Sequence, residues 1–495
     1  MNGILHALAA HAAQRPNDLA VQGDELSLSW QALEEESLGL AKSLGNVCCL
    51  GLLLDNSPAW VVADVTALRM GITCVPVPGF FSREQRRHVL DDAEVDALIT
   101  DDAGLAESLE AGWHFRKILV AGQSLVLARR PARPEGKRRG AEKITYTSGT
   151  TGRPRGVRLG LDAMEAVAKS LCRLSRASVD DRALALLPLS ILLENIGSLY
   201  VPMLAGAPML VPSPESLGLS GSGSVDAARL SATLARIRPS AVIVPPQLLK
   251  LLTGLAKAGK LPDSFRFVAV GGALLPAARV EEARELGLPV YQGYGLSEAC
   301  SVVAMNSPAA SRDSSVGKVL PHCELRISDD GEILVRGALF RGYLHQEDWN
   351  PDDFLPTGDL GYLDEDGFLH VMGRKKNLVI TAYGRNVSPE WPEAELLAEP
   401  EISQAAVFGD GRPWLAAVLL PSSHAGPDAV RQALERVNSR LPDYARVLGH
   451  VPADEAFTLL NGQATANGRP RREEIYRHYR HRLDALYHRE DARVL

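Results

Sequence analysis

Cysteine is scarce in this sequence and follows no metal-binding or disulfide pattern. The 495 residues contain six cysteines, with no CxxC pair and no zinc-ligand spacing. Neither a structural metal nor a disulfide framework is therefore expected. The pattern predicts reduced thiols that are buried as small apolar side chains. The six are Cys48, Cys49, Cys74, Cys172, Cys300 and Cys323.

Long apolar runs and an excess of positive charge are also missing. No run reaches the roughly 18 apolar residues of a membrane span, and the N-terminal segment lacks the basic start and full apolar core of a signal peptide. The net charge of −7 gives no general attraction to nucleic acid or to anionic membranes. We therefore expect a cytoplasmic protein with no integral membrane segment and no nucleic-acid partner. Any phosphate ligand must be held by local groups.

The sequence does contain an alternation of short apolar runs and amphipathic stretches. Runs such as 183–187, Ala241–Val244 and 265–270 are typical of strands, and stretches such as 58–69 and 226–237 are typical of helices. This alternation predicts an α/β fold with parallel-type sheets. A chain of 495 residues is also too long for one ordinary core, so we expect more than one domain.

The pattern changes near residue 322. Short strands separated by Asp/Gly turns follow, which predicts a β-rich subdomain over 322–375 within a large N-terminal domain of residues 1–375. A basic stretch, Arg374-Lys-Lys376, then leads into a separate α+β pattern. We expect a small, mobile C-terminal domain over residues 376–495.

A loop that is dense in hydrogen-bond donors follows an apolar strand end at 146–157. Glycines let backbone N–H groups approach an anion closely, hydroxyls donate to phosphoryl oxygens, and arginines add positive charge. The loop does not have the GxxxxGK[ST] pattern of P-loop NTPases. The sequence predicts a phosphate-binding loop with these candidate residues: Thr147, Ser148, Gly149, Thr150, Thr151, Gly152 and Arg155.

This loop resembles the signature loop of the adenylate-forming superfamily, which contains acyl-CoA synthetases, amino-acid adenylation domains and luciferases. In that family the loop is mobile, holds the β- and γ-phosphates of ATP, and usually ends in Thr-Gly-x-Pro-Lys-Gly. Arg155 stands where the lysine is usual. Further segments match in the family's order over nearly the whole chain, and those around Lys376 and Arg469 look most like long-chain acyl-CoA synthetases.

The next two matches imply an adenine and metal site. The turn at 271–273 resembles the one whose backbone lies against adenine, which assigns Gly272 and Ala273. In the segment 291–298 the resemblance implies that an aromatic ring stacks on adenine, that a hydroxyl faces phosphate and that a carboxylate holds Mg²⁺. A carboxylate suits that cation because Mg²⁺ prefers oxygen ligands. The assigned residues are Tyr294, Gly295, Ser297 and Glu298.

The following matches imply a ribose site and a hinge. Asp359 resembles the aspartate that accepts both ribose hydroxyls, and Arg374 a further ribose contact. Lys376 falls at the pivot about which the family's C-terminal domain rotates between an adenylating and a thioester-forming arrangement. Gly384 then belongs to the loop that lines the pantetheine tunnel. Asn377 replaces the more usual aspartate.

The last match is the glycine turn at 461–472, where Arg469 takes the place of the adenylation lysine that bridges the attacking carboxylate and the α-phosphate. Both signature lysines have thus become arginine, which keeps the charge but is longer and planar. Two explanations stay open. Either arginine does the same electrostatic work, or the chain is a catalytically weakened nucleotide- or acyl-binding homologue. The catalytic roles fall to Arg469, Glu298 and Thr151.

The resemblance implies an AMP-forming acid–thiol ligase that uses ATP, Mg²⁺ and CoA. A carboxylate would attack the α-phosphorus of Mg·ATP, and a thiol would then displace AMP from the acyl-AMP. A phosphopantetheinyl carrier protein offers the same thiol as CoA and would meet the basic helix at 471–488, which is equally typical of a solvated surface.

A fatty acid is the preferred substrate and an aryl acid the next. Ile191 replaces the histidine that many relatives carry at this place, so a histidine gate is not expected. The apolar residues of this segment form either a substrate wall or an ordinary buried helix: Ile191, Leu192, Leu193, Ile196, Leu199, Val201 and Met203.

Overall fold

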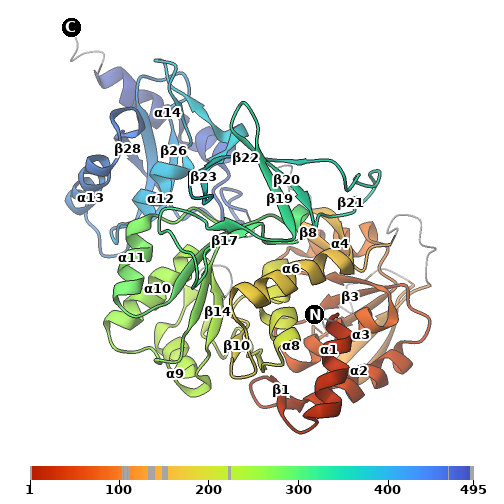
Figure 1. Ribbon diagram of the computed structural model, residues 1–495. Coiled ribbons are helices and arrows are strands. Elements are labelled where there is room, and N and C mark those ends of the chain that lie inside the picture. Colours follow the sequence, from red (N-terminus) through yellow and green to blue (C-terminus); the bar gives the residue numbers. More distant parts are fainter. Residues whose placement is uncertain are drawn as a thin grey trace.

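The computed structural model describes residues 3–102, 104, 109, 112–131, 140–147, 154–220, 224–465 and 468–490. Two large mixed sheets carry the first two thirds of the chain, and smaller sheets follow (Figure 1). Helices pack on the faces of the large sheets, as the alternation of strand-like and helical segments predicts. No helix in the described ranges has the length and apolar character that crossing a membrane requires.

The first large sheet has nine strands with a parallel centre. Six strands from β1 to β16 run parallel, and β2, β17 and β18 add antiparallel edges. The order is β18 (Lys318–Val319), β17 (Ala304–Met305), β16 (Val290–Tyr294), β15 (Phe267–Val270), β14 (Ala241–Val244), β10 (Ala183–Leu184), β11 (Met209–Leu210), β1 (Leu19–Gln22) and β2 (Ser27–Ser29).

The second large sheet has eight strands. Its parallel centre consists of β8, β4, β3 and β5, and the outer strands are antiparallel. The order is β21 (Gly342–Tyr343), β9 (Arg155–Leu159), β8 (Lys143–Thr147), β4 (Thr73–Pro76), β3 (Cys49–Leu53), β5 (Ala97–Thr100), β7 (Gln123–Arg129) and β6 (His114–Val120).

Most of the smaller sheets lie in the last third of the chain. An antiparallel sheet contains β19 (Cys323–Ile327), β20 (Glu332–Gly337), β22 (Leu355–Leu363) and β23 (Leu369–Arg374). A three-stranded sheet contains β26 (Ile402–Phe408), β27 (Leu415–Pro421) and β28 (Val447–Pro452). Two further pairs are β12 (Leu219–Ser220) with β13 (Ser224–Val225), and β24 (Val379–Ile380) with β25 (Asn386–Val387).

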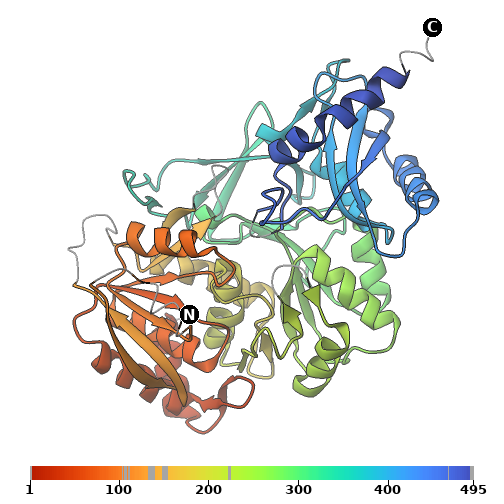
Figure 2. The same ribbon diagram turned by 180° about the vertical axis from the view of Figure 1, so that it is seen from behind.

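Helices pack against the two large sheets and against the three-stranded sheet. The blue C-terminal elements lie above the green helices α10 and α11 in Figure 1, and Figure 2 shows α14 on the outer side of the molecule. The helices are α1 (Ile4–Gln14), α2 (Trp30–Leu44), α3 (Pro58–Met70), α4 (Arg83–Asp92), α6 (Leu161–Leu174), α7 (Leu192–Asn195), α8 (Val201–Ala205), α9 (Ala227–Ile237), α10 (Pro246–Lys257), α11 (Ala277–Glu285), α12 (Glu390–Ala398), α13 (Pro427–Arg440) and α14 (Arg472–Glu490).

Four short helical turns complete the elements. One is a π-helix, η1 (Ile196–Tyr200), which joins α7 to α8. The others are 3₁₀ turns: η2 (Ser297–Ala299), η3 (Lys375–Asn377) and η4 (Asp443–Ala445).

Helix α3 lies in the centre of the largest apolar core. Ser57 caps its first turn by accepting from Trp60 N–H, and Pro58 occupies a position where a missing N–H costs nothing. Its residues from Pro58 to Leu68 are all buried, as expected for a helix enclosed on every side. Asp64 in this helix forms a buried ion pair of 2.6 Å with Lys143 of β8.

Two sequence expectations need correction. The strand expected at 183–187 ends early, because the side chain of Glu194 accepts from Leu186 N–H (3.1 Å) and Asn56 donates to the Leu187 carbonyl (2.8 Å). Side chains therefore replace the ladder bonds there. None of the six cysteines forms a disulfide, but the expected burial was wrong for Cys48, which is exposed, and holds only in part for Cys323.

Candidate functional site

The candidate phosphate loop joins two paired strands. Thr147 ends β8 and Arg155 begins β9, and the two residues face each other in the ladder. Thr147 is half-buried and Arg155 is exposed. The remaining assigned residues of this loop, Ser148, Gly149, Thr150, Thr151 and Gly152, lie outside the described residues.

Helix α4 holds the chain on both sides of this loop. The Tyr146 hydroxyl donates to Asp92 Oδ2 (2.8 Å), and His88 Nε2 lies 3.1 Å from the Pro154 carbonyl oxygen. His345 Nε2 also lies 2.7 Å from the other oxygen of Asp92. Polar contacts from one helix therefore fix the residue before the loop, the residue after it, and the segment that follows β21.

Glu298 lies in a tight, strained turn. Cys300 and Ser301 have φ angles of 48° and 95°, in the left-handed region that non-glycine residues rarely occupy. A side chain at Gly295 would place its first carbon 1.7 Å from the Ser301 carbonyl oxygen, so only glycine fits. The Glu298 carbonyl accepts from Phe340 N–H (2.8 Å). Ser297 begins the same turn and is partly buried.

A second cluster joins the predicted ring and the predicted ribose contacts. The Tyr294 hydroxyl donates to Asp359 Oδ2 (2.7 Å), and Arg374 Nε lies 2.7 Å from Asp359 Oδ1. Asp359 and Arg374 face each other between β22 and β23, so the sheet register sets this pair. Burial raises the pKa of the Asp359 carboxyl, while Arg374 and the Tyr294 hydroxyl oppose that shift.

Arg469 reaches this region from the C-terminal segment. Its Nη2 donates to the Gly272 carbonyl oxygen (2.6 Å), and it interacts electrostatically with Arg374, Asp359 and Glu390. The Arg469 backbone N–H donates to Thr465 Oγ1 (3.1 Å). Gly272 adopts a φ of 89°, which favours glycine, and it is exposed together with Ala273. Two segments nearly 200 residues apart thus meet at this carbonyl.

The hinge candidates Lys376 and Gly384 are exposed. Lys376 lies exposed in η3, beside Asn377, whose side chain donates to Glu390 Oε1 (2.5 Å). Gly384 is exposed in a turn that packs on the C-terminal segment itself, where Ala382 N–H donates to the Arg412 carbonyl (2.8 Å). The structure therefore does not bring Gly384 into the cluster around Asp359.

Two further residues belong to the site although sequence reasoning passed over them. The Tyr343 hydroxyl donates to Glu298 Oε1 (2.7 Å). Glu390 accepts from Asn377 and from the Ser388 hydroxyl (2.7 Å), and it lies near Arg469. The Gly342-Tyr343 pair, which forms a short edge strand, is the sequence feature that could have pointed to Tyr343. No local pattern marks Glu390.

The apolar segment 187–203 contributes mainly to the core. Of its seven singled-out residues, only Ile191 and Leu193 are partly exposed, and a Leu193 methyl lies 3.9 Å from where a side chain at Gly271 would begin. Gly197 lies so close to Ile243 that an added carbon would be 2.4 Å from its side chain. The others, Leu192, Ile196, Leu199, Val201 and Met203, belong to the buried cluster.

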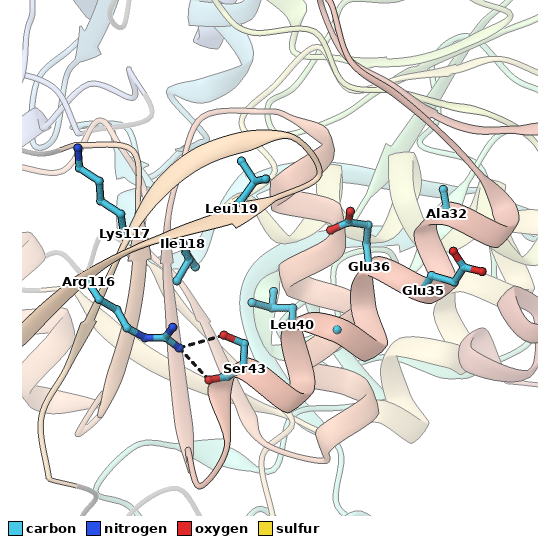
Figure 3. A pocket seen from close by; sticks show the side chains of 10 residues that line it. Ala32, Glu35, Glu36, Leu40, Ser43, Arg116, Lys117, Ile118 and Leu119 are labelled. Carbon is cyan, nitrogen blue, oxygen red and sulfur yellow. Dashed lines mark hydrogen bonds between the residues drawn. The ribbon is translucent and has the colours of Figure 1, made fainter.

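A surface groove of about 550 Å³ lies apart from these residues, between α2 and β6 (Figure 3). Glu35 and Glu36 stand on the helix side, and Arg116 on the strand side donates to the carbonyl and hydroxyl of Ser43 (2.8 and 2.9 Å). None of the predicted site residues lines it. The groove therefore does not enlarge the candidate site.

Two family models match most of the chain. Residues 8–344 match the family model "AMP-binding enzyme", and residues 376–491 match "AMP-binding enzyme C-terminal domain". The chain belongs to the AMP-binding enzyme family, as its resemblance predicts, and it is classed with acid–thiol ligases.

The similar proteins include CoA ligases that are named for two kinds of acid. The 2-succinylbenzoate–CoA ligase of Bacillus velezensis is 30% identical over 433 residues, covering 82% of this chain and 85% of the relative. A long-chain-fatty-acid–CoA ligase of Mycobacterium bovis is 28% identical over 541 residues, covering 87% and 86%.

Solved structures show the same fold. An anthranilate CoA ligase in complex with anthranoyl-AMP superposes with a TM-score of 0.79 at 20% identity, covering 96% of each chain. The o-succinylbenzoate CoA synthetase of Bacillus subtilis, with its acyl-adenylate, gives 0.75 at 24% identity, covering 95% and 97%. The α/β fold class with a large N-terminal and a smaller C-terminal part is thereby confirmed.

Proposed function

We propose that this chain activates a carboxylic acid as acyl-AMP with ATP and Mg²⁺ and then transfers the acyl group to CoA. One observation carries the proposal. Arg469 of the C-terminal segment donates to the Gly272 carbonyl and lies near the Tyr294–Asp359–Arg374 cluster. A cation from the C-terminal segment thus reaches a site whose other groups suit a nucleotide.

The residues present fit the nucleotide and its metal. Asp359 accepts from Tyr294 and Arg374, so its two oxygens are directed toward donors, as a ribose clamp requires. Within the described ranges, no group of three His, Cys, Asp or Glu residues is arranged to hold a metal ion. A single carboxylate such as Glu298 suits Mg²⁺, which proteins hold through one or two carboxylates plus substrate phosphates. Bound there, Mg²⁺ would neutralise phosphate charge.

The protein's own part in the first half-reaction is positioning and charge compensation. Arg469 would contact the incoming carboxylate and the α-phosphate, two anions that otherwise repel each other. Asp359 would exchange its contacts with Tyr294 and Arg374 for ribose hydroxyls. Thr147, Ser297 and Arg155 would contact phosphate oxygens, together with Thr151 and its neighbours. No protein nucleophile is required.

The proposed acid has an apolar body, with a fatty acid first and an aryl acid second. Leu193 is the apolar side chain nearest the Gly271 turn. Glu194, the one acidic residue of segment 187–203, is fully buried and accepts from Leu186 N–H and the Ser198 hydroxyl (2.7 Å). Burial raises its pKa to about 8. It is therefore committed to the core and gives no support to an amino-acid substrate.

CoA is the proposed acceptor in preference to a carrier protein. Two arginines of α14 pair with carboxylates of the C-terminal segment, Arg477 with Glu474 (2.5 Å) and Arg482 with Asp454 (2.7 Å). Such pairs are typical of a solvated surface. We further propose that residues 1–375 and 376–495 form two domains, with 322–375 as a subdomain. Lys376 would be the pivot, and Gly384 would line the pantetheine path after rotation.

The test is an ATP–pyrophosphate exchange screen over fatty, aryl and amino acids. Exchange above background with an apolar acid, followed by thioester formation with free CoA, is the expected result. Absence of exchange with every acid, combined with retained ATP binding, would instead support a catalytically weakened homologue. Thioester formation only on a carrier protein would overturn the choice of CoA.

A further inference from the structure

Three segments that are distant in the chain meet at Tyr343. Its hydroxyl donates to Glu298 Oε1 at 2.7 Å. The guanidinium carbon of Arg155 lies 3.8 Å from the centre of its ring. One tyrosine therefore connects the predicted metal carboxylate with the arginine that replaces the signature lysine.

The sheet fixes the position of this ring. Tyr343 in β21 faces Val157 in β9, and Arg155 is two residues from Val157, so Arg155 and Tyr343 are diagonal neighbours on one face. The backbone is held as well, because Leu344 N–H donates to the Gly156 carbonyl (2.8 Å). The fully buried Arg158 donates to the Arg341 carbonyl (2.9 Å) and anchors the turn before the strand.

The Tyr343 ring also packs against Phe340. The two rings meet edge to face at 5.1 Å, and Phe340 in turn lies 5.7 Å from Trp349. Phe340 N–H also donates to the Glu298 carbonyl. The segment 340–343 thus holds both the backbone and the side chain of Glu298, so the carboxylate does not have to find its direction when a ligand arrives.

The chemistry of the contact suits a fixed donor. A phenol hydroxyl carries one hydrogen that it can donate, and in Tyr343 that hydrogen is directed at Glu298 Oε1. A planar guanidinium also stacks on an aromatic face better than the compact ammonium group of lysine. Arginine at 155 thus has a local partner that fits its shape.

We propose that Tyr343 is a positioning residue that orients Glu298 for the cation of a metal–nucleotide substrate and provides the surface on which Arg155 is held. This inference rests on the proposed function, since it assumes that Glu298 serves a bound cation. It predicts that the hydroxyl and the ring of Tyr343 have separable effects. The hydroxyl serves Mg²⁺, and the ring serves Arg155.

The experiment measures ATP affinity by calorimetry with and without Mg²⁺, in the absence of any acid. The ratio of the two affinities reports the metal contribution alone. Tyr343→Phe is expected to lower this ratio about 5- to 10-fold and to leave AMP binding unchanged. Tyr362→Phe, a half-exposed tyrosine stacked on His370, is the matched control and should keep the wild-type ratio.

A second pair of variants tests the ring. Arg155→Lys should weaken Mg·ATP binding several-fold in the wild type and add little in a Tyr343→Leu background. An equal penalty in both backgrounds would overturn the stacking role. If Tyr343→Leu fails to fold, the Tyr343→Phe ratio still decides the hydroxyl role.

Glu298→Ala separates this inference from the function on which it rests. If that variant keeps the wild-type Mg²⁺ ratio, the metal assignment of the proposed function is overturned. If Glu298→Ala removes the gain in ATP affinity that Mg²⁺ gives, while Tyr343→Phe keeps that gain, only the role of Tyr343 fails. The expected result is that both variants reduce the gain in ATP affinity that Mg²⁺ gives.

Discussion

Arg155 and Arg469 are the two arginines that we propose take the place of the family's usual lysines, yet they are held in different ways. Arg155 begins a strand of the eight-stranded sheet and stacks on Tyr343, a neighbour within that sheet. Arg469 follows a glycine turn and reaches Gly272 only because the C-terminal segment docks on the rest of the chain. Register fixes the first arginine, whereas docking fixes the second.

The C-terminal segment contacts the rest of the chain at defined points besides Arg469. Lys250 of α10 donates to the carbonyls of Leu397 (3.4 Å) and Glu399 (3.1 Å) at the end of α12, where a cation is favoured. Leu459 packs against the buried cluster that includes Tyr146 and Leu344. Adenylation should therefore depend on these contacts, while ATP binding through the Arg155 side should not.

Removing the docked cation should have the largest effect. Arg469→Ala is expected to lower acyl-AMP formation by about 10²- to 10³-fold, because a charge aimed at the reacting groups is lost. Thioester formation from supplied acyl-AMP should largely persist. The two half-reactions are measured separately, by pyrophosphate exchange and by thiol consumption. Equal loss of both would contradict the assigned role, and faster adenylation by Arg469→Lys would mean that arginine is a weaker substitute.

Weakening the docking contact should have a smaller effect on the same half-reaction. Leu459→Ala removes apolar contact worth about 1 kcal/mol, so adenylation should fall about 5-fold while ATP affinity stays constant. Leu460→Ala is the matched control, because that neighbouring side chain is 99% exposed. A similar loss in both variants would show that the loop matters for another reason.

The ion pairs near the Arg469 turn should make the unfolding free energy depend on pH. Burial raises the pKa of Glu393 to about 7, although the adjacent Arg472 at the start of α14 opposes the shift. Because the folded pKa exceeds the unfolded value of 4.5, the protonated carboxyl contributes stability below pH 4.5 that is lost as pH rises through about 7.

Between pH 5 and about 7.5, the unfolding free energy of Glu393→Gln should therefore fall less than that of the wild type, by about 1–3 kcal/mol. Melting temperatures across that range measure it. Adenylation should change about 2-fold, since the Arg469 turn is only indirectly supported. An unchanged pH profile would contradict the raised pKa.

Sequence reasoning performs unevenly on the fold for a physical reason. The strand Ala241–Val244 is found with its observed bounds, because a fully apolar run between breakers leaves little choice. The strand expected from Ala183 is too long, because Glu194 and Asn56 take over its backbone bonds. Such competition depends on tertiary contacts that no window of sequence contains.

The same limit applies to the site. The ordered motifs locate Asp359, Tyr294 and Arg469, because each lies in a segment with its own glycine turn or recognisable sequence. Tyr343 escapes, because its meaning comes from the pairing of β21 with β9, about 185 residues apart in the chain. The residues of the phosphate loop at 148–153 stay predictions.

Among the arginines compared, those of α14 should have the smallest effect on activity and stability. Arg477 is 70% exposed and paired with Glu474 one turn earlier, so it lacks both a ring such as Tyr343 and a docked partner such as Gly272. Arg477→Ala should change the unfolding free energy by less than about 0.5 kcal/mol and leave transfer to CoA unchanged. Thermal melts and thioester assays measure this. A selective loss of transfer to a carrier protein would identify α14 as a docking surface, and the basic helix would then resemble the Arg469 turn in having a partner outside its own segment.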